Sequence, residues 1–587
     1  MTAHPSPRAV VGLLLVLTLA AGLLRLRHID FGLPESAEPD CRIPFQVENL
    51  RRSGDWPRSD KELTWYPLVI ARTAALLPEP PPVPAGASLA EHIAAAARPY
   101  AQVRAAGALL GLLAVPLTWL LARRFLTPSW SLVAAAFVAV SMLHVGFSQQ
   151  SRPHAASAGM YLLPMLACLH LRRSVRLHAW LLCGFALALA IGTLHSGVAL
   201  FLPLAMVWFL GARAGGRWLE LRLLIPLAVV ALSLPVSYPF WFSTQSAGVD
   251  VQGSVVKLAA HPVYLSDFNG AGFRIMLRTF WYYEPALLVA CVLALAWLVR
   301  DRALPGTVRD AERRRDLWVV LAFVLPYSLV TGVYLHVYER FALPLVPYAA
   351  CLASWGLART SRALTRGLGT VAARTVPCGL ALAALALPAY ASWRLVAVRG
   401  QPTTNQQAAA WLTTHLQPGD ARILLSPPLD LPLARTTEGL LVNGQPPPAR
   451  SKYYWARYQY GLDPGRRPLP AWDLRWLQVA GATYLERLER DPLGVLADDG
   501  ADLAVVEVFA PGRNLPAATR MLEELRRKRP LLVRFTPDAR ADYSEHPFGY
   551  EDMTHVKAEN FLLRLLQAER TGPVIEVFDL RRGAGGH

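Results

Sequence analysis

Four ionisable residues lie at the ends of long apolar runs, where their side chains could bind a phosphate group. Arg152 and His154 belong to a polar turn between two apolar runs, His195 ends another run, and Arg340 opens a later one. A guanidinium can bind a phosphate through paired hydrogen bonds. Ionisable residues in or beside membrane-spanning segments are functional candidates by default. The alternatives are an interfacial arginine that reaches for the membrane surface and a neutral histidine hydrogen-bonded between helices.

Two acids, Glu38 and Asp40, stand in the first long loop, shortly after the first apolar run. A carboxylate that follows the first apolar run this closely can fold back onto the membrane surface. The alternative is an ordinary solvated acid, because exposed acids are commonplace in loops.

Long apolar runs dominate the first two thirds of the 587 residues, of which 53% overall are apolar. Runs such as residues 9–24, 105–121 and 179–194 are nearly free of charge and approach the roughly 20 residues that a membrane-spanning helix needs. One such run also fits a buried helix of a soluble protein, but no soluble core could bury the whole set. The sequence therefore predicts a polytopic α-helical membrane protein with about eleven transmembrane helices.

The net charge of +17 comes largely from short arginine-rich loops between the apolar runs. By the positive-inside rule these loops face the cytoplasm, which leaves the long loops at about residues 25–100 and 241–284 on the outer side. Arg25 and Arg27 run against this pattern, but they begin a long loop, where the rule is weaker. No basic tract with interleaved aromatic residues occurs, which argues against a nucleic acid as a partner.

The second long loop ends with Arg278, Tyr282 and Tyr283, just ahead of an apolar run. We expect this loop to pack over the candidate site. Its Arg278 side chain can bind an anionic group there. The aromatic residues also fit an interfacial belt at the membrane surface.

The last third of the chain reads as a soluble α/β domain, so we divide the chain into residues 1–396 and 397–587. An amphipathic helix is predicted over residues 404–416 and another over 517–528. Short β-rich runs at residues 422–425, 503–508, 531–535 and 574–580 predict strands. With an odd number of preceding helices, this domain lies on the outer side. No catalytic motif stands out in it.

Four stretches, taken in order, carry a family resemblance. They are the two motifs that follow the first helix, the polar turn before the fourth, the opening of the tenth, and the two ends of the C-terminal domain. In the sequence these are Phe31-Gly32-Leu33-Pro34 with Glu38-Pro39-Asp40, Ser148-Gln149-Gln150-Ser151-Arg152-Pro153-His154, Tyr338-Glu339-Arg340-Phe341-Ala342-Leu343-Pro344, and Ala408-Ala409-Ala410-Trp411-Leu412 with Gly572-Pro573-Val574-Ile575-Glu576.

Together these stretches resemble the GT-C membrane glycosyltransferases of the protein O-mannosyltransferase and aminoarabinose transferase superfamily, in particular bacterial members. The resemblance implies a multi-pass protein of the bacterial inner membrane. It implies transfer of a sugar, with inversion, from a polyprenyl-phosphate lipid to an acceptor hydroxyl at the outer face. Asp40 then matches the catalytic base, with Glu38 assisting. The resemblance also implies that the donor lipid or its phosphate is bound by Arg340, Arg152, His154, His195 and Arg278.

Three positions depart from the family pattern. Cys41 follows Asp40 where a glutamate is usual, His154 stands where an aspartate is frequent, and His195 stands where a lysine is common. These departures leave open a catalytically degenerate relative that binds glycolipid without turnover. A lipid or solute transporter is a weaker alternative, because ionisable residues avoid the middle of the apolar runs. No metal-ligand cluster is present, so we predict neither a metal nor another cofactor.

Overall fold

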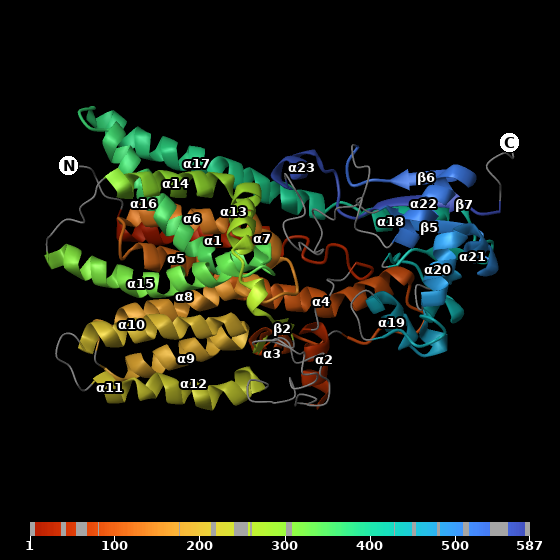
Figure 1. The fold of residues 1–587 in the computed structure, drawn as a ribbon, viewed down its shortest axis with the longest axis horizontal. Coiled ribbons are helices and arrows are strands. Elements are labelled where there is room, and N and C mark those ends of the chain that lie inside the picture. The colour runs from red at the N-terminus through yellow and green to blue at the C-terminus, as the bar shows by residue number, and fades with distance from the viewer. Residues whose placement is uncertain are drawn as a thin grey trace.

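The computed structural model shows a helical bundle with a smaller region, built on a β-sheet, at one end of it (Figure 1). The structure describes residues 6–36, 43–53, 67–79, 81–174, 176–212, 219–239, 256–258, 261–300, 308–427, 429–448, 453–477, 482–508, 516–539 and 561–581. Both loop acids singled out in the sequence, Glu38 and Asp40, lie outside the described residues.

The bundle is made of long apolar helices with shorter ones at their ends. Its long members are α1 (Pro7–Leu26), α4 (Leu89–Leu112), α5 (Ala114–Ala122), α6 (Pro128–Ala139), α8 (His154–Leu171), α9 (Leu177–Thr193), α10 (Phe201–Ala212), α12 (Leu224–Ser237), α14 (Pro285–Arg300), α15 (Val308–Val333), α16 (Val346–Leu364) and α17 (Thr370–Arg399). Its shorter elements are α2 (Ile43–Ser53), α3 (Val69–Ala75), α7 (Met142–Ser148), α11 (Leu219–Arg222), α13 (Ala271–Tyr283), the 3₁₀ helices η2 (His195–Leu200), η5 (Leu265–Asp267) and η6 (Glu339–Leu345), and the strands β1 (Val256–Leu258) and β2 (His261–Val263).

Several of these helices are long and apolar enough to cross a membrane. Among the described residues there are 6 such helices, or up to 8 if two bent pairs each count as one span, and further apolar helices are shorter. The bent pairs are α6 with α7 and α13 with α14, whose axes turn by 51° and 117°. The chain is therefore a multi-pass membrane protein, and the predicted count of about eleven spans stays a prediction.

Small residues bring α4 and α8 into close contact. A Cβ atom on Gly159 would lie 2.5 Å from the Leu110 carbonyl oxygen, and one on Gly111 would lie 3.2 Å from that of Ala155. Gly107 stands one turn before Gly111, in the small-xxx-small spacing by which membrane helices approach each other. The close contact fixes the start of α8, where His154 lies, against α4.

Ion pairs centred on the buried Asp316 join two of the arginine-rich loops. Arg172, at the end of α8, donates to Asp316 in α15 over 2.7 Å and to Glu312 over 2.6 Å. Arg173 binds the other oxygen of Asp316, which is fully buried. The end of α8 and the beginning of α15 therefore lie at the same end of the bundle, as the predicted sidedness requires. Which side of a membrane this end faces stays a prediction.

The charge pattern has one exception that the packing explains. Arg25 is fully buried and donates to the carbonyl oxygens of Val138 and Ala139, each over 2.9 Å, at the end of α6. It also contacts the His144 ring nitrogen at 3.0 Å. Because α6 ends there, these carbonyls can accept hydrogen bonds from outside the helix. Arg25 is thus a structural residue of the bundle interior rather than a loop charge that obeys the positive-inside rule.

The C-terminal region is built on a five-stranded sheet in the order β4-β3-β5-β7-β6. Its strands are β3 (Ile423–Leu425), β4 (Leu474–Trp476), β5 (Leu503–Val508), β6 (Leu531–Phe535) and β7 (Val574–Asp579). Strand β3 pairs in parallel with β4 and β5, whereas β7 runs antiparallel to both β5 and β6.

Helices pack on both faces of this sheet, because alternate residues of its strands enter two separate apolar cores. Ile423, Leu503 and Val577 share one core with α18 (Thr404–His415), whereas Ala504 and Phe578 share the other with the remaining helices. Those are α20 (Ala482–Arg490), α21 (Pro492–Asp498) and α22 (Pro516–Lys528), and α19 (Tyr454–Tyr460) lies on the side of α18. The helices predicted at residues 404–416 and 517–528 and the four predicted strands are present, whereas β4 was not predicted. The domain boundary at residue 396 stays a prediction.

After β6 the chain returns to the bundle before it adds its last strand. Helix α23 (Phe561–Gln567) packs against α13 and α17. The Phe561 ring stacks on that of Tyr283, with centroids 4.4 Å apart, and Arg394 donates to the Ala568 carbonyl oxygen. Phe561 and Leu565 are buried in the same apolar core as the bundle helices.

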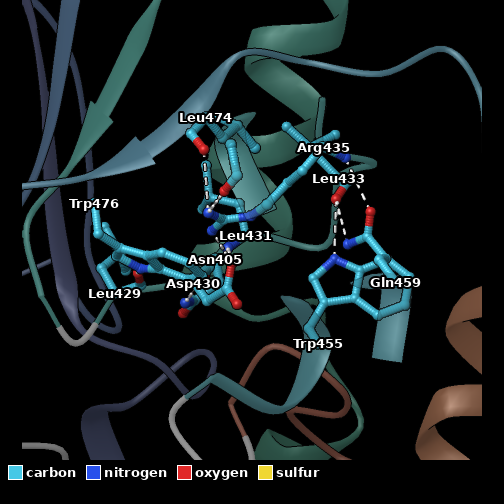
Figure 2. Close-up of polar contacts among 11 residues, drawn as sticks. Asn405, Leu429, Asp430, Leu431, Leu433, Arg435, Trp455, Gln459, Leu474 and Trp476 are labelled. Atoms are coloured by element: carbon cyan, nitrogen blue, oxygen red, sulfur yellow. Dashed lines mark hydrogen bonds and ion pairs between the residues drawn. The ribbon is translucent and has the colours of Figure 1, made fainter. Parts of the chain in front are cut away.

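A buried ion pair organises the loop that follows β3 (Figure 2). Arg435 donates to Asp430 over 2.5 Å and to the carbonyl oxygens of Gly439 and Leu474 over 3.1 and 3.2 Å. Its guanidinium carbon lies 3.6 Å from the centroid of the Trp476 ring. Both charged side chains are essentially inaccessible to water, so each depends on the other for its charge.

We expect Asp430→Ala to destabilise the C-terminal region by about 3–5 kcal/mol, because it leaves the Arg435 charge buried without its partner. Limited proteolysis of the full-length protein in detergent measures this as faster cleavage within residues 403–581. Asp463→Ala, at an exposed position, is the control and should change the cleavage rate little. Equal cleavage of the two variants would show that the pair adds nothing to stability.

Candidate functional site

The polar turn between α7 and α8 is buried, although it carries charged and amide side chains. Arg152 is 7% exposed and His154, the first residue of α8, is 4% exposed. Arg399, the last residue of α17, donates to the Gln149 amide oxygen over 2.8 Å and to the Gly146 carbonyl over 3.0 Å. Because α17 leads into α18 within a few residues, these bonds place the turn at the bundle end that faces the sheet.

The 3₁₀ helix η6 packs against α8 and brings Arg340 to the same site. The half-buried Arg340 lies over the ring of Tyr338, with its guanidinium carbon 4.0 Å from the ring centroid. The ring of Phe341 is 5.6 Å from the same carbon and 5.8 Å from the His154 ring. Aromatic faces attract a guanidinium and limit its motion, so these rings hold Arg340 beside the start of α8.

The third contribution is His195, at the start of η2. Tyr161 of α8 donates to the Leu194 carbonyl oxygen over 3.1 Å and lies 2.7 Å from the Ser196 hydroxyl, so it contacts both neighbours of His195. Tyr327 of α15 donates to the Phe341 carbonyl oxygen over 3.1 Å, next to Arg340. Sequence reasoning missed these two tyrosines. Their only signal was a hydroxyl group inside an apolar run.

Arg152, His154, His195 and Arg340 thus come together from three separate stretches of the chain, and we call them the cationic cluster. Arg340, Arg152 and His195 all lie close enough to the His154 ring to act on it electrostatically. The Nδ1 atoms of His154 and His195 are buried, and neither has a hydrogen-bond partner among the described residues. Two guanidinium groups and two imidazoles can bind an anion with several oxygens, such as a phosphate.

Arg278 does not join this cluster, and its predicted role in binding the donor lipid or its phosphate stays a prediction. It lies on the exposed side of α13, and no hydrogen bond or ion pair links it to a described residue. The sequence placed Arg278 near the outer end of an apolar run but could not give the rotation of its helix. That rotation is set by Ile275, Met276 and Thr279, which are buried.

The start of the first long loop is held by two arginines that the sequence did not single out. The Phe31 ring lies between the guanidinium groups of Arg104 and Arg399, 4.6 and 4.2 Å from its centroid. Arg104 also donates to the carbonyl oxygens of Ile29 and Phe31 over 2.7 and 2.9 Å. Gly32 has φ +66°, a left-handed conformation that glycine adopts without strain. The Phe-Gly-Leu-Pro motif is therefore a fixed turn against α4 and α17.

Glu35, which follows this turn, lies against residues of the C-terminal region. Its side chain is buried beside Thr403, Gln406 and Asp430. Burial raises the pKa of Glu35 to about 7, and the charge of Asp430 acts in the same direction. Glu35 is therefore largely neutral below this pH. Above it, the carboxyl group ionises while it is buried between the first loop and the C-terminal region.

We expect the free energy of unfolding to fall as the pH rises from about 4.5 to 7. In this range Glu35 keeps its proton in the folded protein but has already lost it in the unfolded chain. The loss amounts to up to about 3 kcal/mol. Glu35→Gln removes the ionisable group, so this variant should keep its thermal unfolding midpoint between pH 5 and 8 better than the wild type does. Equal pH profiles of the two proteins would contradict a buried, proton-binding Glu35.

No three His, Cys, Asp or Glu side chains are grouped as metal ligands in the part of the chain that the structure describes. Because the first-loop acids lie outside that part, the prediction that no metal is required stays a prediction. So does the role of Asp40 and Glu38.

Comparison with known families supports the resemblance drawn from the motifs. Residues 79–242 match the family model described as dolichyl-phosphate-mannose-protein mannosyltransferase. This segment contains Arg152, His154 and His195 of the cationic cluster. The match supports the assignment to the GT-C superfamily of membrane glycosyltransferases. A comparison with curated proteins found no match.

Three solved structures show the range of structural likeness. The Archaeoglobus fulgidus oligosaccharyltransferase in its apo form is 11% identical, with a TM-score of 0.45 over 86% of this chain and 70% of that one. ArnT from Cupriavidus metallidurans, bound to undecaprenyl phosphate, is 16% identical, with a TM-score of 0.39 over 86% and 94%. A mutant of the arabinofuranosyltransferase AftD from Mycobacteria is 16% identical, with a TM-score of 0.37 over 100% and 42%. TM-scores below 0.5 do not establish a shared fold, so the support for the superfamily comes from the matched segment.

Proposed function

We propose that the protein is an inverting glycosyltransferase that moves a sugar from a polyprenyl-phosphate lipid to an acceptor hydroxyl at the outer face of the bacterial inner membrane. The observation that carries this proposal is the cationic cluster, in which four side chains suited to a phosphate meet at one end of a membrane bundle. The matched family model, which is named for a dolichyl-phosphate sugar, supports a lipid-linked donor of this class.

The cluster can stabilise the group that leaves in such a reaction. When the acceptor oxygen bonds to the anomeric carbon, the bond from that carbon to the phosphate oxygen breaks and the phosphate gains negative charge. Arg340 and Arg152 bind this charge in a site that is largely closed to water, where electrostatic stabilisation is strong. The buried nitrogens of His154 and His195 supply further contacts to the phosphate oxygens. A single displacement of this kind inverts the anomeric centre.

The acceptor proton must go to a base, and we assign this role to Asp40, with Glu38 in support. Both flanks of the segment that carries them are anchored to helices that border the polar turn. On one side Phe31 is held by Arg104 and Arg399. On the other side Ile43, the first residue of α2, shares an apolar core with Ala156, which lies two residues after His154.

The test incubates the purified protein in lipid nanodiscs with a panel of polyprenyl-phosphate sugars and detects free polyprenyl phosphate by mass spectrometry. Parallel reactions with nucleotide sugars are the control for donor class. Release of polyprenyl phosphate alone supports the proposal. Consumption of a nucleotide sugar would contradict the donor class.

A second candidate is a degenerate relative that binds glycolipid without turnover, favoured by Cys41 in place of the usual glutamate and by His154 and His195. It predicts tight binding of the glycolipid and no release of polyprenyl phosphate across a panel of hydroxyl acceptors. Turnover with any acceptor would exclude it.

A further inference from the structure

Helix α13 divides its surface into three stripes that have different neighbours. At 100° per residue, Ile275, Met276 and Thr279 form one stripe, which is buried against the bundle. On the opposite side Phe273, Leu277 and Trp281 form an apolar stripe that is 51%, 59% and 57% exposed. Arg274 and Arg278 form the third stripe beside it, one helical turn apart.

The packing of α13 fixes which stripe faces outward. A Cβ atom on Gly272 would lie only 2.1 Å from the Thr331 carbonyl oxygen, so the beginning of α13 lies directly on the end of α15. The axis of α13 turns by 117° from that of α14, and Figure 1 shows α13 crossing the bundle near the ends of α14 and α15 that lie toward the sheet. The helix therefore lies close to the plane in which the membrane surface meets these ends.

The exposed apolar area continues beyond the helix. Leu265 and Phe268, just before α13, are 77% and 43% exposed. Neither Arg274 nor Arg278 makes a hydrogen bond or an ion pair with a described residue. An apolar stripe next to an unpaired basic stripe, on a helix in the interfacial plane, has the character of a helix that is buried in headgroups and acyl chains.

We propose that α13 binds the surface of an anionic bilayer, with Phe273, Leu277 and Trp281 among the acyl chains and Arg274 and Arg278 on the phosphates of phosphatidylglycerol. The charge of the two arginines matches an anionic headgroup, and their side chains lie at the edge of the apolar stripe, where headgroups begin. This inference is independent of the glycosyltransferase activity, because it concerns a surface outside the cationic cluster.

The experiment places the full-length protein in nanodiscs that contain headgroup-labelled, photoreactive phosphatidylglycerol or the same label on phosphatidylcholine. After irradiation, mass spectrometry measures labelling of the peptide that contains α13. We expect phosphatidylglycerol to label it preferentially. Arg274→Gln/Arg278→Gln should reduce that labelling at least about tenfold and leave phosphatidylcholine labelling unchanged. Phe273→Ser/Leu277→Ser should reduce labelling by both lipids, because it removes the apolar anchor.

Two results would overturn the proposal. Equal labelling of wild-type α13 by the two lipids would show insertion without recognition of an anionic headgroup. Displacement of phosphatidylglycerol by equimolar undecaprenyl phosphate would show that α13 binds the donor-type lipid instead. Unchanged labelling elsewhere in the bundle of both double variants confirms that they are folded.

Discussion

Arg340→Gln is expected to lower kcat/KM for transfer from a polyprenyl-phosphate sugar about 100-fold. The substitution removes a positive charge from beside His154 at the point where the departing phosphate gains negative charge, and loss of one such contact typically has this effect. If the interaction forms mainly in the transition state, kcat falls by the same factor as kcat/KM. Steady-state kinetics with varied donor concentration measure both constants.

Two further variants, Arg340→Lys and Arg520→Gln, test whether the loss of activity is specific to the guanidinium group of Arg340. Lysine keeps the charge but cannot form the paired hydrogen bonds of a guanidinium, so about a tenfold loss is expected. Arg520 is exposed on α22, far along the chain from the cluster, and its substitution should leave kcat/KM unchanged. If Arg340→Gln had wild-type kinetics, the leaving phosphate could not bind at Arg340.

Asp40→Asn is expected to lower transfer by about 10²–10⁴-fold, the range in which a general base contributes to catalysis. Asparagine keeps the shape of the side chain but cannot accept the proton of the acceptor hydroxyl. The measurement is the initial rate of polyprenyl phosphate release in nanodiscs.

Binding of the donor separates this effect from misfolding, because Asp40→Asn should bind the glycolipid as tightly as the wild type. Cys41→Ala, at the next position, should retain most of the activity. Glu38→Gln should have an intermediate effect if this acid assists Asp40. An Asp40→Asn protein that transfers sugar at the wild-type rate would require a different base.

Four of the five residues predicted to bind the donor phosphate lie together in the cationic cluster, and each was singled out because it stands at the end of an apolar run. Their role in binding phosphate stays a prediction. Residues at the same end of consecutive spans share one layer of the bundle, so Arg152, His154, His195 and Arg340 had few other places to lie. Arg278 satisfied the same criterion and still falls outside the cluster. Its position depends on how α13 is rotated on α15, which is decided by contacts with residues far away in the chain.

In the C-terminal region, too, features set by the local sequence could be predicted, whereas features set by distant contacts could not. The strand at residues 503–508 was predicted because it is rich in valine and Glu507 is its only charged residue, and it is buried on both faces. By contrast, β4 has Arg475 between its two apolar residues, so it lacks the continuous apolar run by which the equally short β3 was predicted. Nothing near Glu35 in the sequence indicates Asp430, whose approach depends on the fold of both regions.

The route of the chain through α23 has a consequence for biosynthesis. Strand β7 occupies an interior position of the sheet, between β5 and β6, yet it is made last. Between β6 and β7 the chain first returns to the bundle, where Phe561 stacks on Tyr283. The chain must therefore pass through α23 before β7 can pair with β5 and β6, so completion of the sheet is linked to the packing of α23 on the bundle.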